Sequence, residues 1–112
     1  MLKARVLAVV AATTLAGAIA VGPAIPAQAA TVVKATQSLQ FKPQTLRVHK
    51  GTKVVWKNVC TCTHTVTATS NNWSKNTTLH PGDSTSFTFK RTGTYKYHCT
   101  IHAGMTGKVI VG

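Results

Sequence analysis

The residues with the greatest capacity for chemistry lie together near the end of the sequence. Cys99, His102 and Met105 follow one another with the spacing Cys-x2-His-x2-Met. A thiolate, an imidazole and a thioether are soft or borderline donors, and this combination suits copper better than the other common metal ions. A complete copper site needs a further ligand, which an element far away in the sequence must supply.

The alternation of side chains along a β-strand indicates where that ligand comes from. In the expected strand that ends at Cys99, the thiol shares a face with Tyr97, whose aromatic ring marks that face as the buried one. His98 points to the other side of the strand, so we exclude it from the site. Upstream, His64 begins an expected strand and shares the buried face with Val66. An inward histidine at the start of one strand can meet an inward cysteine at the end of another.

Together the four donors define one kind of metal centre. His64, Cys99 and His102 would form a trigonal set around one copper ion, and Met105 would add a weak, long axial contact. This is the donor set of a type 1 (blue) copper site, which carries single electrons by cycling between Cu(I) and Cu(II). A short ligand loop held by the ends of a sheet limits how far the ligands move between the two oxidation states.

Each of these residues alone has a simpler interpretation. An inward cysteine is more often a small core residue than a ligand, and a single histidine or methionine beside a turn usually has a packing role. The spacing after Cys99 and the in-phase His64 are together much harder to explain by packing alone. No enzymatic activity is indicated, because Asp83 is the only carboxylate side chain and acid–base catalysis by paired carboxylates is therefore excluded.

The pattern beyond the N-terminal segment predicts an all-β fold. Short runs rich in Val, Thr, Phe and Tyr are separated by Gly, Pro and Asn, and none shows helical periodicity. We expect a β-sandwich of about seven strands, with antiparallel pairing as the default. The expected strands are 31–34 with 39–41 as one opening strand, 45–49, 52–58, 64–69, 84–90, 94–99 and 108–111, with a loop around Trp73.

Residues 38–112 resemble the cupredoxins, the family of plastocyanin, pseudoazurin and amicyanin. The motifs that carry the resemblance are Phe41-x-Pro43, Leu46-x-Val48, Val54-x-Trp56-x-Asn58, His64-Thr65-Val66, Pro81-Gly82, Phe87-x-Phe89 and Gly93-x-Tyr95-x-Tyr97-x-Cys99. The resemblance implies a Greek-key topology and one copper ion held by His64, Cys99, His102 and Met105. It also implies electron transfer through the exposed edge of His102. The Cys-x2-His-x2-Met spacing is similar to the short ligand loop of amicyanin, whereas plastocyanin has a longer gap between its His and Met.

Two departures from the family pattern lie around the first histidine. The segment between Trp-x-Asn and His64 commonly has no cysteine in the family, but here it contains Cys60 and Cys62. The residue after His64 is Thr65, where several members have an asparagine that helps to fix the site.

Cys60 and Cys62 allow several interpretations. Our first is a disulfide, because an exported protein folds in an oxidising space. Our second is a secondary copper site, which would make the protein a copper-handling protein for storage, buffering or delivery in the cell envelope. A mixed site, in which one of the two competes with Met105 for the metal, is a further option. The last is a structural zinc site in a non-redox module, built from Cys60, Cys62, Cys99 and a histidine.

Residues 1–29 have the composition of a signal peptide. Two basic residues precede an apolar run, and Ala27-Gln28-Ala29 forms a small-residue cleavage motif. The run is shorter than the ~20 residues that a membrane span requires. We therefore expect cleavage after Ala29, or after Ala30, and a mature copper-binding domain of residues 30–112 without a transmembrane span. This predicts an exported protein, located in the periplasm, the extracellular space or the cell envelope.

The basic charge bears on the partner. Thirteen Lys and Arg residues against one Asp give a formal net charge of +12. Nucleic acid is a poor candidate, because the charges are scattered and no basic recognition element is present. The charge either keeps a monomer in solution or steers it towards an anionic cell envelope or a redox partner protein with an acidic surface.

Overall fold

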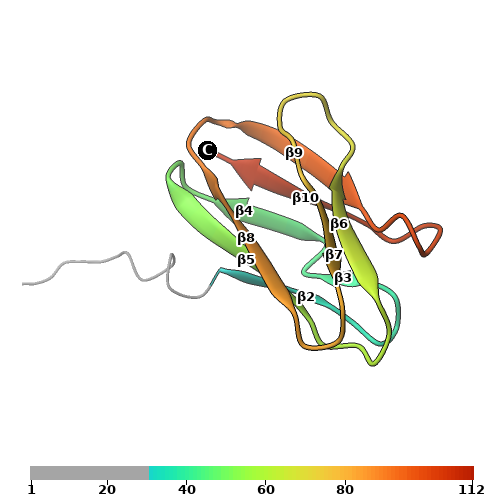
Figure 1. The fold of residues 1–112 in the computed structure, drawn as a ribbon. Coiled ribbons are helices and arrows are strands. Elements are labelled where there is room, and N and C mark those ends of the chain that lie inside the picture. The colour runs from blue at the N-terminus through green and yellow to red at the C-terminus, as the bar shows by residue number, and fades with distance from the viewer. Residues whose placement is uncertain (1–30) are drawn as a thin grey trace, which may run out of the picture. The chain divides into compact units, whose positions relative to one another are not determined.

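The computed structural model describes residues 31–112, which form nine β-strands in two sheets (Figure 1). The five-stranded sheet has the order β4-β10-β9-β6-β7 and the four-stranded sheet the order β3-β2-β5-β8. The strands are β2 (Val32–Ala35), β3 (Phe41–Lys42), β4 (Thr45–Val48), β5 (Thr52–Asn58), β6 (His64–Ala68), β7 (Asn76–Leu79), β8 (Ser84–Phe89), β9 (Gly93–His98) and β10 (Thr106–Val111). No helix among the described residues is long and apolar enough to cross a membrane. The predicted signal peptide, residues 1–29, lies outside the described residues.

Side chains alternate between the core and solvent along the strands, as the sequence predicts. In β5, Val54 and Trp56 are buried while Lys53 and Lys57 are exposed. The same alternation in β9 buries both tyrosines. Burial of these apolar and aromatic surfaces is the main source of stability for a domain of this size, at roughly 25 cal/mol for each Å² removed from water.

Aromatic rings fill the space between the two sheets. The Trp56 ring lies 5.4 Å from the Tyr97 ring and 6.1 Å from the Trp73 ring, between ring centroids. Phe41 meets the other side of Tyr97 edge-on at 4.8 Å. Gly107 of β10 makes this packing possible, because a Cβ there would lie 2.5 Å from the Tyr97 ring. The core therefore continues up to the residues next to Cys99.

The prediction of an all-β sandwich is confirmed, but the prediction of about seven strands is too low for the described residues. The expected opening strand is in fact two strands, β2 and β3, joined by a turn. Strand β7 was not predicted, because only Leu79 of its four residues is buried and the others give no hydrophobic pattern. Backbone pairing with β6 holds this polar strand in place. Two strand pairs, β2 with β5 and β4 with β10, are parallel rather than antiparallel. Local sequence patterns do not predict these parallel pairs. The two strands of each pair are separated in the sequence by at least one strand of the other sheet.

The register of β6 against β9 brings distant residues to one end of the sandwich. The two strands are antiparallel, with Thr67 opposite His98 and Ala68 opposite Tyr97. The start of β6 and the end of β9 therefore lie at the same end of the sheet. His64 begins β6 and Cys99 directly follows β9, so the fold places both beside the loop from β9 to β10.

Two buried polar groups in the core lack hydrogen-bond partners among the described residues. They are the indole nitrogen Nε1 of Trp56 and the phenol oxygen of Tyr97. Burial raises the pKa of Tyr97 to about 12, and the Trp56 indole N–H, which is close to the hydroxyl but outside hydrogen-bonding geometry, lowers it by a smaller amount. The unfolded chain releases the phenol proton near pH 10, whereas the folded protein keeps it up to about pH 12. The free energy of unfolding therefore falls as the pH rises from about 10 to 12.

We predict that Tyr97→Phe removes this loss. The free energy of unfolding should be equal to or higher than that of the wild type at pH 7, because an unpaired buried hydroxyl is lost. At pH 12 the variant should keep roughly 2 kcal/mol that the wild type loses. Urea unfolding followed by fluorescence at both pH values measures the difference. Tyr95→Phe is the control, since Tyr95 donates to the Arg91 carbonyl at 2.8 Å and its loss should destabilise at both pH values. A parallel alkaline loss in Tyr97→Phe and wild type would contradict the prediction.

Candidate metal centre

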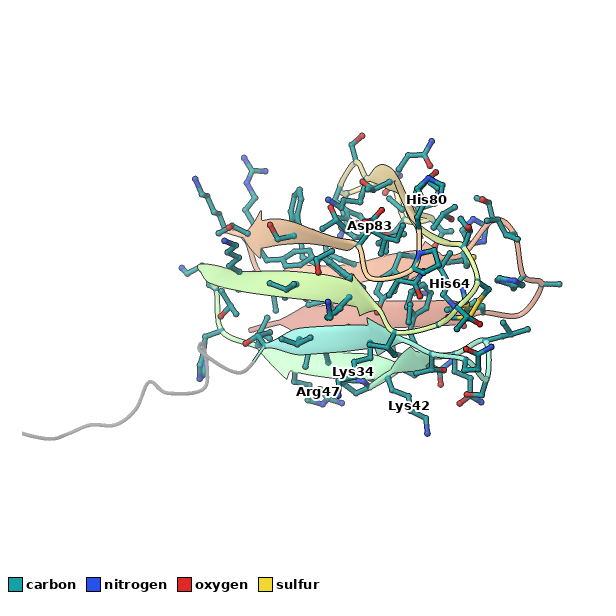
Figure 2. All side chains as sticks on the ribbon, turned by 60° about the horizontal axis from the view of Figure 1, so that its bottom comes forward. Lys34, Lys42, Arg47, His64, His80 and Asp83 are labelled. Atoms are coloured by element: carbon teal, nitrogen blue, oxygen red, sulfur yellow. A yellow bond between two sulfur atoms is a disulfide. The ribbon has the colours of Figure 1, made fainter. Side chains whose placement is uncertain are left out.

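Three potential ligand atoms form a triangle at the end of the sandwich. The Nδ1 atoms of His64 and His102 are 3.2 Å apart. Cys99 Sγ lies 3.5 Å from Nδ1 of His102 and 3.9 Å from Nδ1 of His64. Figure 2 shows His64 among the side chains at this end of the two sheets. The structure thus brings together three of the four residues that the sequence predicts as metal ligands.

The triangle has the size that a metal ion requires. Bonds of about 2.0 Å to nitrogen and about 2.3 Å to sulfur place neighbouring ligand atoms roughly 3 to 4 Å apart. Two imidazole nitrogens and a thiolate are the donors of a trigonal copper site. The residues present therefore fit copper in both their chemistry and their spacing.

His64 is held so that one particular nitrogen faces the triangle. Its side chain is fully buried, and its Nε2 lies 3.0 Å from the carbonyl oxygen of Thr36. A carbonyl only accepts hydrogen bonds, so Nε2 carries the proton and Nδ1 presents its lone pair to the site. Burial lowers the pKa of His64, the Thr36 carbonyl raises it and the His102 charge lowers it further. The net lowering favours the neutral imidazole, which is the form that binds a metal.

The sulfur of Cys99 is held by the residue after His64. The backbone N–H of Thr65 donates to Cys99 Sγ at 3.3 Å and so fixes the position of the sulfur. The Thr65 hydroxyl accepts from the backbone N–H of Thr100 at 2.9 Å and lies 3.2 Å from the Thr100 hydroxyl. These contacts tie β6 to the start of the ligand loop.

The loop from Cys99 to Met105 is closed by its own backbone. Cys99 N–H donates to the Met105 carbonyl at 2.9 Å, and Met105 N–H donates to the His102 carbonyl at 3.2 Å. Gly104 has a φ of 80°, a left-handed conformation that a glycine adopts without strain. Met105 is 3% exposed and packs with the core, so its thioether is held at the same end of the sandwich. His98 is not part of the ligand cluster among the described residues.

Cys60 and Cys62 lie on the other side of His64. The structure joins them in a disulfide, visible as the yellow bond in Figure 2, and leaves Cys99 as the free thiol. Cys62 Sγ is 3.4 Å from Nε2 of His64. Cys60, Cys62 and His64 form a second group of potential metal ligands, with the three ligand atoms within 4.8 Å of one another.

Sequence reasoning missed the two residues that fix the surroundings of His64. The Thr36 carbonyl sets the tautomer of His64, and no sequence signal points to a backbone acceptor. Asn58 holds the next loop, because its amide donates to the carbonyls of Cys62 and Leu79 at 2.8 and 2.9 Å. Its position in Trp-x-Asn, before the first histidine, was the available signal.

Comparisons with known proteins agree with this geometry. The sequence model of the copper binding proteins of the plastocyanin/azurin family matches residues 27–112. Plastocyanin from Lactuca sativa is 34% identical over 87 residues, which cover 65% of this chain and 88% of that protein. A solved structure of an amicyanin variant in its Cu(I) form has a TM-score of 0.68 and 32% identity, covering 74% of this chain and 82% of that chain. A purple cupredoxin from Nitrosopumilus maritimus has a TM-score of 0.63 and 26% identity, covering 73% and 99%.

The chain therefore belongs to the plastocyanin/azurin family of copper-binding proteins. The predictions of a cupredoxin and of copper as its cofactor are confirmed by the family match and the donor cluster.

We predict that Thr65→Val destabilises the copper-free protein by about 1 to 3 kcal/mol. The substitution leaves the Thr100 N–H without its acceptor at a half-buried position. The free energy of unfolding in urea measures the effect, and Thr88→Val, an exposed threonine on β8, is the matched control. Equal stability of Thr65→Val and Thr88→Val would show that the hydroxyl does not hold the loop.

Proposed function

We propose that this protein is a one-electron carrier with a type 1 copper site. In this proposal His64, Cys99 and His102 are the three strong ligands, and Met105 is the weak axial ligand. The observation that carries the proposal is the triangle of two Nδ1 atoms and one Sγ at the end of the sandwich. When bound, copper supplies the couple between Cu(I) and Cu(II).

The surroundings of the ligands suit a site that must change little with oxidation state. His64 is held by the Thr36 carbonyl, and Cys99 is held by the Thr65 N–H and by its own backbone bond to Met105. Because the protein fixes these ligands before the electron moves, little reorganisation has to accompany transfer. His102 is half-buried, so one edge of its ring reaches the surface.

Three large apolar side chains are exposed in the loops that carry or hold the proposed ligands. Ile101, next to His102, is 53% exposed, and Leu39 and Val59 are 42% and 45% exposed. Leu39 belongs to the turn after Thr36, and Val59 precedes the Cys60 loop. Leu39 has a φ of 63°, a left-handed conformation that costs a leucine roughly 1 to 2 kcal/mol. A strained and exposed leucine in the turn that also supplies the Thr36 carbonyl supports a role in contacting the redox partner.

A row of like charges supports an acidic partner. Lys42, Lys34 and Lys57 lie directly opposite one another across β3, β2 and β5, with their side chains exposed. Like charges facing each other across a sheet are destabilising, so the row has a cost for folding. Figure 2 shows Lys34 and Lys42 on one side of the sandwich, away from Asp83. We infer that this row attracts an acidic surface of the redox protein.

The same proposal covers catalysis and location. The Asp83 carboxylate accepts the backbone N–H of His80 at 3.0 Å and so stabilises a turn rather than a reaction. We propose that the protein is not an enzyme and that it acts as a monomer after export, in the periplasm or another extracellular compartment. The predicted signal peptide, residues 1–29, supports export.

We predict an intense blue thiolate-to-Cu(II) absorption band for the copper-loaded protein. Cys99→Ser should lose the band, because the thiolate that gives rise to it is absent. The Cys60→Ser/Cys62→Ser double variant, which removes two sulfurs rather than one, should keep it. A colourless protein that holds zinc or only Cu(I) would instead favour the structural zinc module or the copper-handling function.

We predict that electron exchange with an acidic redox protein slows as ionic strength rises, because salt screens the attraction. Lys34→Gln/Lys57→Gln should reduce the rate constant roughly threefold or more at low salt and flatten its salt dependence. Lys50→Gln/Lys90→Gln makes the same charge change at the far end of β5 and β8 and should have a smaller effect. Stopped-flow kinetics measures all three proteins, and a flat response in the wild type would exclude steering.

A further inference from the structure

We propose that Cys60 and Cys62, once reduced to thiols, form with His64 a second copper site that takes Cu(I). The site lies on the opposite side of the His64 ring from the first site and shares that imidazole with it. This inference rests on the proposed function only in that His64 belongs to both sites.

The ligand atoms of this second site are already assembled. Cys60 Sγ, Cys62 Sγ and a ring nitrogen of His64 lie within 4.8 Å of one another. Cys62 Sγ is 3.4 Å from Nε2, whereas Nδ1 of the same ring faces Cys99 and His102. Cys62 is half-buried while Cys60 is buried, so the pair is approached through Cys62. Two thiolates with an imidazole are soft donors of the kind that selects Cu(I).

The loop keeps its shape without the sulfur–sulfur bond. The Asn58 side chain accepts the Cys60 N–H at 2.8 Å and donates to the Cys62 carbonyl at 2.8 Å. Asn58 itself is anchored to the Leu79 carbonyl. The side chain of Gln37 accepts from the Thr61 N–H at 3.0 Å. These bonds hold both cysteines from the backbone, so reduction leaves the two sulfurs side by side.

The disulfide contributes little to holding the fold together. It joins residues only two positions apart. The stabilisation that a cross-link gives by restricting the unfolded chain grows with the length of the loop that it closes, and this loop is about as short as a loop can be. A stabilising role is therefore a weak reason for two cysteines to stand beside a metal ligand.

Cys60 also has the hydrogen-bond environment of a metal-bound sulfur. The backbone N–H of Cys62 donates to Cys60 Sγ at 3.0 Å. Cys99 Sγ receives the N–H of Thr65 in the same way at 3.3 Å. A backbone N–H aimed at sulfur compensates part of the negative charge of a thiolate ligand. The sulfurs of Cys60 and Cys99 therefore each accept one backbone N–H.

Formation of the site requires a reductant. A cellular dithiol supplies two electrons and two protons by thiol–disulfide exchange: its own disulfide forms, the Cys60–Cys62 bond breaks, and two thiols result. Cu(I) then binds the pair, and both thiol protons pass to solvent. A neutral imidazole has one lone pair, so coordination through Nε2 gives up the hydrogen bond to the Thr36 carbonyl, places the proton on Nδ1 and withdraws that nitrogen from the first site. Copper in one site therefore weakens copper in the other.

Cu(I) titration against a chromophoric chelator, in the absence of oxygen, tests the site. Cys99→Ser removes the thiolate of the first site, so the variant reports the second site alone. After reduction with a phosphine, Cys99→Ser should bind one equivalent of Cu(I) at least ~100-fold more tightly than its disulfide form. The triple variant with Cys60→Ser and Cys62→Ser should bind like the disulfide form under both conditions. Equal affinity of the thiol and disulfide forms would overturn the proposal.

Two further arms make the outcome independent of one variant. The wild-type protein should take up more Cu(I) as the dithiol than as the disulfide when the metal is in excess, with a weaker second binding step because the two sites share His64, and identical titration curves would overturn the proposal. His64→Ala in the Cys99→Ser background should weaken Cu(I) binding by about tenfold or more, and unchanged affinity would exclude His64 from the site. None of these arms uses the blue band, so failure of the electron-carrier proposal and failure of this one are distinguishable.

Discussion

The hydrogen bond from His64 Nε2 to the Thr36 carbonyl is the constraint on which the metal centre depends. It links the turn after β2 to the start of β6 and determines which imidazole nitrogen is free for a metal. With the ring turned over, a ring carbon would take the place of Nδ1 and the triangle with Cys99 would be lost. A single backbone oxygen, from a residue with no chemistry of its own, thus orients the most deeply buried ligand.

Packing in the core positions the other residues of the site. Tyr97 packs among Phe41 and Trp56, and Cys99 follows it after one further residue of β9. Rigid aromatic packing therefore sets the direction in which the strand delivers the thiolate. Asn58 extends the same order to the loop that precedes His64. The hydrogen bonds of Asn58 fix the position of this loop, as the aromatic rings fix the position of β9.

Strand phase was enough to predict the inward direction of His64 and Cys99 and the outward direction of His98. These predictions succeeded because the period-two rule is local and the buried face is marked by aromatic and branched residues. Strand β7 and the parallel pairs were missed, since a polar strand such as Asn76–Leu79 is stabilised by a partner that its own residues do not reveal. The role of Thr36 could not be predicted either, because it acts through its backbone carbonyl and every residue has one.

The position of β10 in its sheet has a consequence for biogenesis. This strand is last in chain order, yet it lies between β4 and β9, where it pairs with one in parallel and with the other antiparallel (Figure 1). The five-stranded sheet cannot close until β10 is available, and its pairings join distant segments of the chain, a feature that correlates with slow folding. The loop that carries Cys99, His102 and Met105 leads directly into β10. Completion of the fold and assembly of the proposed ligands are therefore the same event, and a chain that is not yet fully folded has no finished site in which to capture a metal ion.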